Sequence, residues 1–250
     1  MKIEEQKGHL HPITQFTREV VQIFSEMGFI VADGPELETE FYNFDALNIP
    51  RDHPSRDMQD TFWIKEEAEA KKEIVNEFPA SSKNRPVMRT QTSAVQARFL
   101  EKNKDSLPCA IIVPGRVFRN EATDATHEAQ FGQIEALFVD RDVSLGHLKG
   151  VIEHFLKKLY GDSVEIRFRP SFFPFVEPGV EVDMKFNGKW LEMGGAGMVH
   201  PNVFKTTGID PTIWKGFAFG FGIDRLVMMK HNITDIRLLY SGDLRFVNQF

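Results

Sequence analysis

Three short segments of the sequence combine charged residues or glycines with apolar neighbours in a way that could serve chemistry. In the first, residues 115–121, Arg119 and Glu121 accompany an apolar strand pattern that leads into a polar loop containing His127. The charged side chains make the segment a candidate functional site. An arginine in a strand is often just part of a solvated face, and the segment alone leaves both interpretations open.

The second and third segments are rich in glycine. Residues 216–225 contain three glycines within seven residues, which in a strand usually mark the close approach of a ligand or of backbone. A tightly packed turn from strand to helix would explain them as well. Arg225 falls in the first turn of a predicted helix, where the dipole does not favour a cation, so its charge suggests a functional role. The third segment, 190–197, loses its side chains after Met193 and could form the floor of a pocket.

The elements that position these segments follow from hydrophobic spacing and turn residues. Apolar residues three and four apart predict helices, and alternating residues between turn signals predict strands. We expect helices over 13–27, 92–100 and 144–159 and from Gly222 onward, and strands between 109 and 140 and over 164–168, 181–186 and 189–193, the last two joined by an Asn187-Gly188 hairpin turn. This order predicts an α+β domain built on an antiparallel sheet.

Two segments lack a clear period. Residues 36–62 are polar and aromatic, and we expect an ordered loop, where function often concentrates. Residues 65–85 are the most charged stretch, and we expect a variable surface insertion there. No repeat divides the chain, so a single domain, 1–250, is expected. No Gly-Lys-Ser/Thr phosphate loop is present, so side chains must hold the phosphates of any nucleotide.

The composition narrows the class of protein. A net charge of −6 argues against a surface built for nonspecific nucleic-acid binding, although a local site or a partner can still hold one. The single cysteine, Cys109, excludes a disulfide framework and a cysteine-based zinc site. No apolar run approaches the roughly 18 residues of a membrane span, and the charged N-terminus is unlike a signal peptide, so we expect a cytoplasmic protein without a membrane partner.

Two of the segments resemble known motifs. Phe118-Arg119-Asn120-Glu121 resembles motif 2 of class II aminoacyl-tRNA synthetases, and Gly220-Phe221-Gly222-Ile223-Asp224-Arg225 resembles motif 3. Five further segments resemble, in the right order, the α subunit of bacterial-type phenylalanyl-tRNA synthetases: 44–50, 60–63, 89–93, 172–178 and 197–201. The resemblance runs from Gly8 to Phe250 and implies one catalytic domain with the class II antiparallel sheet flanked by helices.

Three features depart from the family pattern. The family's α subunit usually carries an N-terminal coiled-coil arm that touches tRNA, and we expect it to be absent here. Gly132 and Ala136 stand where relatives commonly have histidine and glycine, and the insertion at 65–85 is longer than expected. None of the three removes a residue that the activation chemistry requires.

The resemblance implies that phenylalanine and ATP form phenylalanyl-adenylate and pyrophosphate, followed by transfer to tRNA(Phe). The amino acid's own carboxylate is the nucleophile, so catalysis depends on alignment and on charge stabilisation rather than on a general base. By the family pattern Arg119 holds the α-phosphate, and Arg225 lies against the adenine and the γ-phosphate. Phe131 would stack on the adenine, Glu121 would contact its amino group, and His127 would contact the triphosphate.

The amino-acid end needs acceptors for an ammonium group and an apolar slot for a benzyl ring. Gln133 and Glu135 have the same-face spacing of a strand and, with Ser93, suit the ammonium. Phe173 and Phe175 likewise share a face and could pack edge-to-face around the substrate ring. The expected set also contains Trp63, Thr92, Val176, Glu192, Ala218 and Phe219. Val176 and the small Ala218 would close the slot; without the resemblance, these apolar residues would be assigned to the core.

The slot also implies partners. An apolar pocket rejects one added hydroxyl by only about 10²-fold, so tyrosine would sometimes be activated and an editing site is expected. In the family this site lies in a β subunit, and residues 12–35 resemble motif 1, an interface element, which implies an α2β2 assembly. The resemblance also implies Mg2+ with ATP and Glu177 as a ligand shared with the partner, although a glutamate before proline is more often a turn residue.

Two other functions stay open from the sequence. A paralogue could form the adenylate and pass it to an acceptor other than tRNA, which the expected absence of the arm supports. A non-catalytic regulatory paralogue is the second alternative, but it would have no need to keep Arg119, Glu121 and Arg225.

Overall fold

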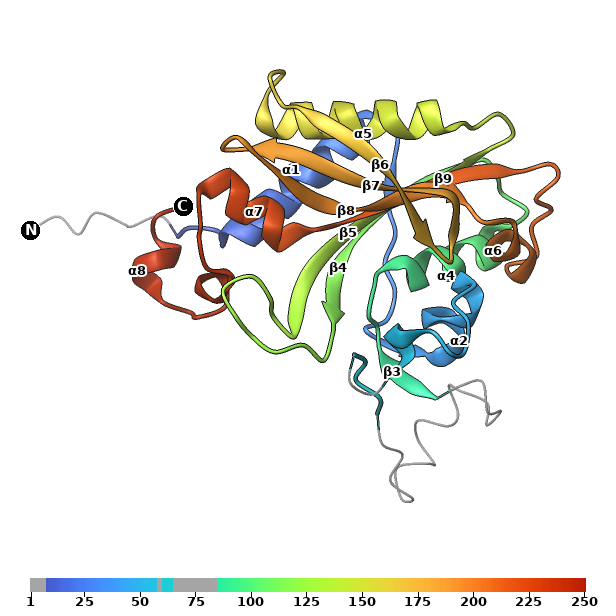
Figure 1. Ribbon diagram of the computed structural model, residues 1–250, viewed down its shortest axis with the longest axis horizontal. Coiled ribbons are helices and arrows are strands. Elements are labelled where there is room, and N and C mark those ends of the chain that lie inside the picture. Colours follow the sequence, from blue (N-terminus) through green and yellow to red (C-terminus); the bar gives the residue numbers. More distant parts are fainter. Residues whose placement is uncertain (1–7, 58–59, 65–84) are drawn as a thin grey trace, which may run out of the picture.

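The computed structural model describes residues 8–57, 60–64 and 85–250, and its centre is a seven-stranded sheet (Figure 1). The strand order is β1-β4-β5-β9-β8-β7-β6. The strands are β1 (Ile30–Val31), β4 (Cys109–Phe118), β5 (Gln130–Asp140), β6 (Ile166–Phe173), β7 (Val176–Phe186), β8 (Lys189–Val199) and β9 (Lys215–Gly222). The short β1 runs parallel to β4, and the other neighbouring pairs are antiparallel, which confirms the α+β prediction.

Helices cover both sides of this sheet. The α-helices are α1 (Pro12–Glu26), α2 (Glu40–Asn43), α4 (Ser93–Asn103), α5 (Leu145–Tyr160), α6 (Pro201–Thr206), α7 (Ile223–His231) and α8 (Leu244–Val247), and the 3-10 turns are η1 (Asp45–Leu47), η2 (Pro54–Arg56) and η3 (Ile236–Leu239). A two-stranded sheet of β2 (Leu37–Thr39) and β3 (Pro86–Met88) lies beside α2. Figure 1 shows α1 and α5 on one side of the large sheet and α2 and α4 on the other.

The alternation of side chains along the strands divides the buried residues between two cores. On β5, Ile134 packs with the phenylalanines of α1 and α5 in the larger core, whereas Leu137 packs with α4 in the smaller one. Phe24 and Phe155, with ring centroids 4.8 Å apart, lie at the centre of the larger core. Gln133 and Glu135 share the face of Leu137, so this strand turns two polar side chains toward the α4 side of the sheet.

Several predicted elements are confirmed. The helices predicted over 13–27 and 144–159 correspond to α1 and α5, and α5 ends at Gly161 with a positive φ of 92°. The hairpin turn between β7 and β8 has Asn187 and Gly188 at φ 49° and 78°, as a two-residue turn requires.

Other expectations need correction. The predicted loop 36–62 contains β2, α2, η1 and η2, whose side chains follow tertiary contacts rather than a period. The strand predicted over 164–168 begins at Ile166 and continues to Phe173. Thr92 occupies the N-cap position of α4, but its side chain makes no capping hydrogen bond. Of the predicted insertion at 65–85, residues 65–84 lie outside the described residues.

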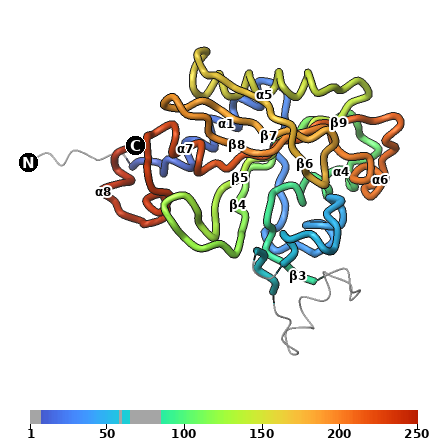
Figure 2. The backbone as a smooth tube through the Cα atoms, viewed as in Figure 1, coloured from blue at the N-terminus to red at the C-terminus, as the bar shows by residue number. Residues whose placement is uncertain are grey.

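The N-terminal helix lies next to the last long helix of the chain (Figure 2). Lys230 of α7 forms an ion pair with Glu19 of α1, and the ring of His11 is hydrogen-bonded to the carbonyl of Leu239 over 3.0 Å. Within the described residues, none of these helices has the length and apolar character needed to cross a membrane.

Candidate active site

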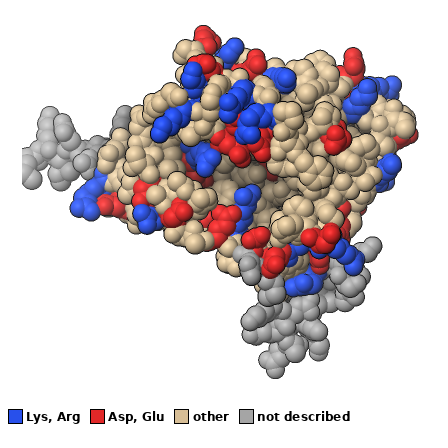
Figure 3. Space-filling model, viewed as in Figure 1, with Lys and Arg blue, Asp and Glu red and all other residues tan. Residues whose placement is uncertain are grey.

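A large hollow opens on the α4 side of the sheet (Figure 3). Its volume is about 860 Å³, within the usual range of small-molecule pockets. The walls come from β5, β8, β9, the turn between β6 and β7, the start of α4, the chain around η1 and the loop after β4. The three segments that stood out in the sequence therefore meet at one place.

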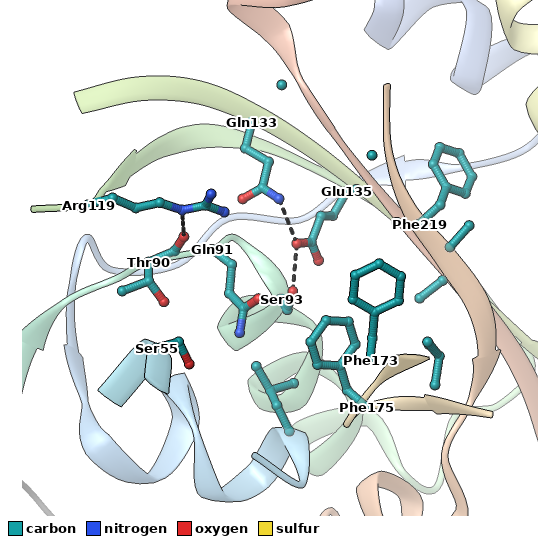
Figure 4. A pocket seen from close by; sticks show the side chains of 18 of the residues that line it. Ser55, Thr90, Gln91, Ser93, Arg119, Gln133, Glu135, Phe173, Phe175 and Phe219 are labelled. Carbon is teal, nitrogen blue, oxygen red and sulfur yellow. Dashed lines mark hydrogen bonds between the residues drawn. The ribbon is translucent and has the colours of Figure 1, made fainter. Parts of the chain in front are cut away.

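One wall of the pocket holds a buried carboxylate surrounded by neutral donors (Figure 4). Glu135 is 5% exposed and accepts hydrogen bonds from Ser93 Oγ at 2.5 Å and Gln133 Nε2 at 3.1 Å. Its other oxygen accepts from Gln96 Nε2 at 2.7 Å. The pairing of Gln133 and Glu135 on one face is as the alternation predicted, and α4 contributes the other two donors.

Burial raises the pKa of Glu135 to about 7. The hydrogen bonds from Ser93 and the positive charges of Arg119 and Arg89 act in the opposite direction but do not cancel the desolvation. A buried carboxylate with neutral donors lacks a full counter-charge, and a ligand ammonium would supply one. The arrangement is therefore suited to bind a cationic group.

Arg119 lies at the opposite side of the same wall, just past the end of β4. Its Nε donates to the carbonyl of Thr90 over 3.3 Å, and its guanidinium lies 5.1 Å from the centre of the Phe131 ring. Burial lowers the pKa of this guanidinium from its ordinary value. The sequence placed Arg119 within the strand; in the structure it follows Phe118, the last residue of β4, and its side chain reaches into the pocket (Figure 4).

The segment that carries Thr90 and Ser93 is held in place by hydrogen bonds to Asn43 of α2. Asn43 is fully buried, donates to Thr90 Oγ1 and accepts from the Thr90 N–H, both over 3.1 Å. The N–H of Thr92 donates to Gln133 Oε1 over 3.1 Å. Thr92 therefore lies behind the pocket wall, outside the lining, and orients Gln133 through its backbone.

A second charged region lies at the mouth of the pocket. Glu121, His127 and Arg225 all line it and are exposed. Asp124 accepts from the N–H of His127 and contacts its Nδ1 at 3.1 Å, and these hydrogen bonds together with those from Thr126 lower the pKa of Asp124. The loop after β4 is thus ordered by its own side chains while His127 stays accessible.

Arg225 is attached to the glycine-rich strand β8. Its Nη1 donates to the carbonyl of Glu192 over 2.8 Å, which places the guanidinium beside another lining residue. The helix that carries it is anchored by Asp224, whose carboxylate accepts from the N–H of Gly132 at 2.5 Å and from the hydroxyl of Tyr240. Burial raises the pKa of Asp224.

Gly132, which stands where the family pattern commonly has histidine, has a structural reason to be glycine. A Cβ at this position would lie 3.1 Å from both Asp224 Oδ2 and Ile223 Cβ, closer than a side chain is normally accommodated. The glycine lets the start of α7 approach β5, which brings Arg225 to the pocket.

The inner end of the pocket is an apolar slot. Phe173 and Phe175 line it with rings 6.0 Å apart and stacked at an interplanar angle of 25°. Val176 and Ala218 complete the predicted slot, and Val199 and Val203 lie beyond them. The slot has the apolar and aromatic lining of a site for an aromatic side chain.

Two glycines create the space for this arrangement. A Cβ on Gly195 would lie 2.7 Å from Cζ of Phe173, and a Cβ on Gly220 would lie 3.0 Å from both Gln133 Nε2 and Glu135 Cγ. The loss of side chains after Met193 therefore does form a pocket floor, as the sequence suggested.

Four of the predicted residues are placed differently from the rest. Trp63 and Glu177 are not among the residues that line the pocket, and the indole of Trp63 packs near Phe44 and 4.0 Å from the guanidinium of Arg85. Thr92 lies behind the wall. Phe219 borders the pocket, but its ring also packs in the larger core, 5.1 Å from that of Phe221.

The sequence interpretation also missed lining residues. Gln96 lies three residues after Ser93 on α4, and this helical spacing was a usable signal for a second donor to Glu135. His53 and Ser55 line the pocket from the aperiodic segment 36–62, where no spacing pointed to them.

The described residues do not by themselves form a metal site. No group of three or more His, Cys, Asp or Glu side chains in the described ranges is arranged to hold an ion. Glu177 is exposed at the start of β7 and lies outside the pocket lining.

The antiparallel sheet with a pocket between a motif 2 arginine and a motif 3 arginine defines the core of a class II aminoacyl-tRNA synthetase. The family model described as "tRNA synthetases class II core domain (F)" matches residues 2–250. Among solved structures, pyrrolysyl-tRNA synthetase from Desulfitobacterium hafniense superposes with a TM-score of 0.70 over 94% of this chain and 75% of its own, at 15% identity, which shows the fold.

Closer relatives specify the family further. The phenylalanine–tRNA ligase alpha subunit of Synechocystis sp. is 47% identical over 244 residues, covering 98% of this chain and 68% of the relative. The protein of that name from Bacillus subtilis is 48% identical over 255 residues, covering 97% and 69%. The chain belongs to the family of phenylalanine–tRNA ligase alpha subunits.

Proposed function

We infer that this chain activates phenylalanine with ATP and charges tRNA(Phe). The observation that carries the inference is the pocket itself, which holds a buried carboxylate, an aromatic slot and a guanidinium within one cavity. The carboxylate suits an amino group, the slot a benzyl ring and the guanidinium a phosphate. Family membership supports the same reaction.

The reaction needs little proton transfer from the protein. The substrate carboxylate attacks the α-phosphorus of ATP, a bond to the phosphorus forms, and pyrophosphate leaves with the electrons of the broken bond. Arg119 is assigned to the α-phosphate, where a preorganised charge stabilises the transition state and holds the reactants in line. Its partial burial strengthens this interaction, since less water competes for the guanidinium.

The ATP end is assigned to the mouth of the pocket. Phe131 offers a ring face for the adenine next to Arg119, and Glu121 offers an acceptor for its amino group. Arg225 and His127, exposed at the mouth, are assigned to the triphosphate. ATP enters as its magnesium complex in this proposal, since Mg2+ is usually held by phosphates with one or two carboxylates. Glu177 would need further ligands from another chain.

The transfer step and the assembly are also part of the proposal. The product adenylate is attacked by a ribose hydroxyl at the end of tRNA(Phe), which releases AMP. The name of the relatives, an alpha subunit, supports a β subunit as partner. We propose an α2β2 assembly in which that partner supplies editing, because an apolar slot discriminates poorly against an added hydroxyl.

The test is amino-acid-dependent exchange of pyrophosphate into ATP, measured for each of the twenty amino acids with a β subunit present. Phenylalanine should give the highest exchange, and labelled phenylalanine should end on tRNA(Phe) rather than on a small acceptor. Arg119→Ala should lower the exchange rate by about 10²–10³-fold with the fold intact by circular dichroism. Exchange within a few-fold of the wild type would refute the assignment of Arg119.

A further inference from the structure

Three of the segments that line the apolar slot are far apart in the sequence. Leu47 and Ile49 come from the chain around η1, Phe175 from the turn between β6 and β7, and Val203 from α6. Leu47, Ile49 and Val203 are buried. The width of the slot therefore depends on how these three segments are held relative to one another.

One side chain, that of Asn48, is hydrogen-bonded to both of the other segments. Its Nδ2 donates to the carbonyl of Pro174 over 2.6 Å, and its Oδ1 accepts from Nδ2 of Asn202 over 3.0 Å. Pro174 lies in the turn between β6 and β7, and Asn202 lies directly before Val203. Within the described part of the chain, the hydrogen bonds that join residues 44–49 to these two segments both run through Asn48.

The backbone at Asn48 is also specialised. Its φ of 57° and ψ of 21° lie in the left-handed region, which asparagine adopts more readily than most residues. This conformation ends η1 between the lining residues Leu47 and Ile49.

The other two segments are tied to each other without Asn48. The N–H of His200 donates to the carbonyl of Phe175 over 2.9 Å, which fixes the start of α6 against the turn between β6 and β7. Asn48 therefore sets the position of residues 44–49 relative to the β6–β7 turn and the start of α6, which are already joined to each other. It is not itself among the lining residues, so it acts through Leu47 and Ile49.

We propose that Asn48 is a positioning residue that sets the width of the aromatic slot and thereby the discrimination between phenylalanine and larger ring substrates. The proposal rests on the proposed function, since it concerns the ring-binding end of the same pocket. Discrimination in an apolar slot depends on volume, and one methylene is worth about 10–200-fold. A wall released by the loss of two hydrogen bonds should bind the phenyl ring less tightly and admit a para substituent.

The test uses substitutions that separate the hydrogen bonds from the backbone. Asn48→Gly keeps the left-handed conformation and removes both hydrogen bonds. Asn48→Asp keeps the acceptor for Asn202 and removes the donor to Pro174. Asn202→Ala removes one bond from an exposed residue. Asn187→Gly is the matched control, because Asn187 has a similar φ of 49° in the exposed β7–β8 turn.

The measurements are the KM for phenylalanine, the KM for ATP and the ratio of kcat/KM for phenylalanine to that for 4-chlorophenylalanine, with a β subunit present. Asn48→Gly should raise the KM for phenylalanine about tenfold, leave the KM for ATP unchanged and shift the ratio toward the larger substrate. Asn48→Asp should act in the same direction, Asn202→Ala more weakly, and Asn187→Gly not at all.

An unchanged ratio in both Asn48→Gly and Asn202→Ala would overturn the proposal. A parallel rise in the two KM values would also overturn it, because a merely structural role predicts loss of both substrates. If Asn48→Gly does not fold, Asn202→Ala decides, since its substitution lies on the surface. If phenylalanine does not stimulate pyrophosphate exchange by the wild-type protein, the proposed function itself is refuted. The wild-type measurement therefore distinguishes this failure from a failure of the Asn48 proposal.

Discussion

At the residue scale, the burial of Glu135 carries a cost that a bound substrate would offset under the proposed function. Its carboxylate is buried among neutral donors, and burial raises its pKa to about 7. Near neutral pH the empty site is therefore divided between protonated and charged forms. A substrate ammonium stabilises the charged form, so the same burial that destabilises the free protein strengthens binding.

Substitution of Glu135 by glutamine should separate these two effects. The amide oxygen still accepts from Ser93, and the NH2 group that replaces the other oxygen donates to Gln96 once the Gln96 amide is flipped. The variant lacks the charge, so the KM for phenylalanine should rise about 10–100-fold. At pH 8 the melting temperature should rise by about 2–4 °C, the shift that roughly 1 kcal/mol produces in a domain of this size. Calorimetry and pyrophosphate exchange on the same preparation measure both. A stable variant with an unchanged KM would show that Glu135 does not meet the ammonium.

The pH dependence of the wild type follows from the same carboxylate. The folded pKa of about 7 lies above the ordinary value of 4.5, so the stabilising contribution of the protonated group is present below pH 4.5 and is lost as pH rises through 7. Phenylalanine binding runs the other way, because the ammonium needs the carboxylate. The KM for phenylalanine should fall as pH rises from 6 to 8, and this dependence should disappear in Glu135→Gln.

Ala218 is the residue whose size should limit the length of the substrate ring. Ala218→Gly should admit 4-chlorophenylalanine, with some loss of stability because glycine costs roughly 0.5–1 kcal/mol in a regular element. Ala218→Val should instead exclude phenylalanine, since overpacking a fitted site is unfavourable. Comparison of exchange rates for the two amino acids tests this. Equal ratios in all three proteins would place the ring elsewhere.

The residues that the sequence placed well are those whose neighbours follow from local spacing. Gln133 and Glu135 were placed together by strand alternation, and the pocket contains them both. Asn48 and Asp224 lie in segments that the resemblance included, but their contacts were not predicted, because their partners, Asn202 and Tyr240, are brought to them only by the fold. No period or motif in a single sequence encodes such contacts.

At the element scale, β8 and β9 form the floor of the pocket because they carry glycines where neighbouring side chains need the space next to the strands. Gly195 lies opposite Gly220 in the register of these two strands. The ring of Phe173 occupies the space that a side chain on Gly195 would fill. Gln133 and Glu135 occupy the space that a side chain on Gly220 would fill. Gly220 is thus explained by close approach, whereas Gly222 is not, because a Cβ there would meet nothing within 4 Å and the residue caps α7.

Gly195→Ala should therefore narrow the slot from below. The new methyl group would lie 2.7 Å from the Phe173 ring and push it toward the substrate, so the KM for phenylalanine should rise about tenfold or more. Gly150→Ala is the matched control, because a Cβ on this exposed residue of α5 meets nothing within 4 Å. It should stabilise the protein by roughly 0.5–1 kcal/mol and leave activity unchanged. Equal KM values in the two variants would contradict the assigned role of Phe173.

The elements themselves were predictable to different degrees. The long amphipathic helices and the Asn187-Gly188 hairpin follow from period and turn chemistry, and both are present. The short elements of 36–62 were read as a loop. Their buried residues, such as Asn43 and Phe44, are held by contacts with α4 and β3, which propensity cannot supply.

At the scale of the whole molecule, the sheet ends in an edge that is apolar and accessible. Ile30 and Val31 of β1 are 59% and 50% exposed. An apolar edge of this kind is typical of a surface that another chain covers. It belongs to the segment whose resemblance to motif 1 implied a subunit interface.

Val31→Glu should test the role of this edge in assembly. Because Val31 is exposed in the single chain, the substitution should leave folding of the chain intact, and it should lower the assembled fraction by placing a charge in the interface. Sedimentation velocity with a β subunit measures the assembled fraction, and exchange activity should fall with it. Full assembly of the variant would place the interface on another surface.

The strand order has a consequence for the order in which the protein can be made. β9 lies between β5 and β8 in the middle of the sheet, yet it follows the sheet's other six strands in the described part of the sequence. Until residues 215–222 leave the ribosome, β5 and β8 have no partner on their facing sides, and each presents an open edge to other nascent chains. The pocket floor and Arg225 arrive together with this final strand. The growing polypeptide therefore has no complete pocket until residues 215–225 have left the ribosome.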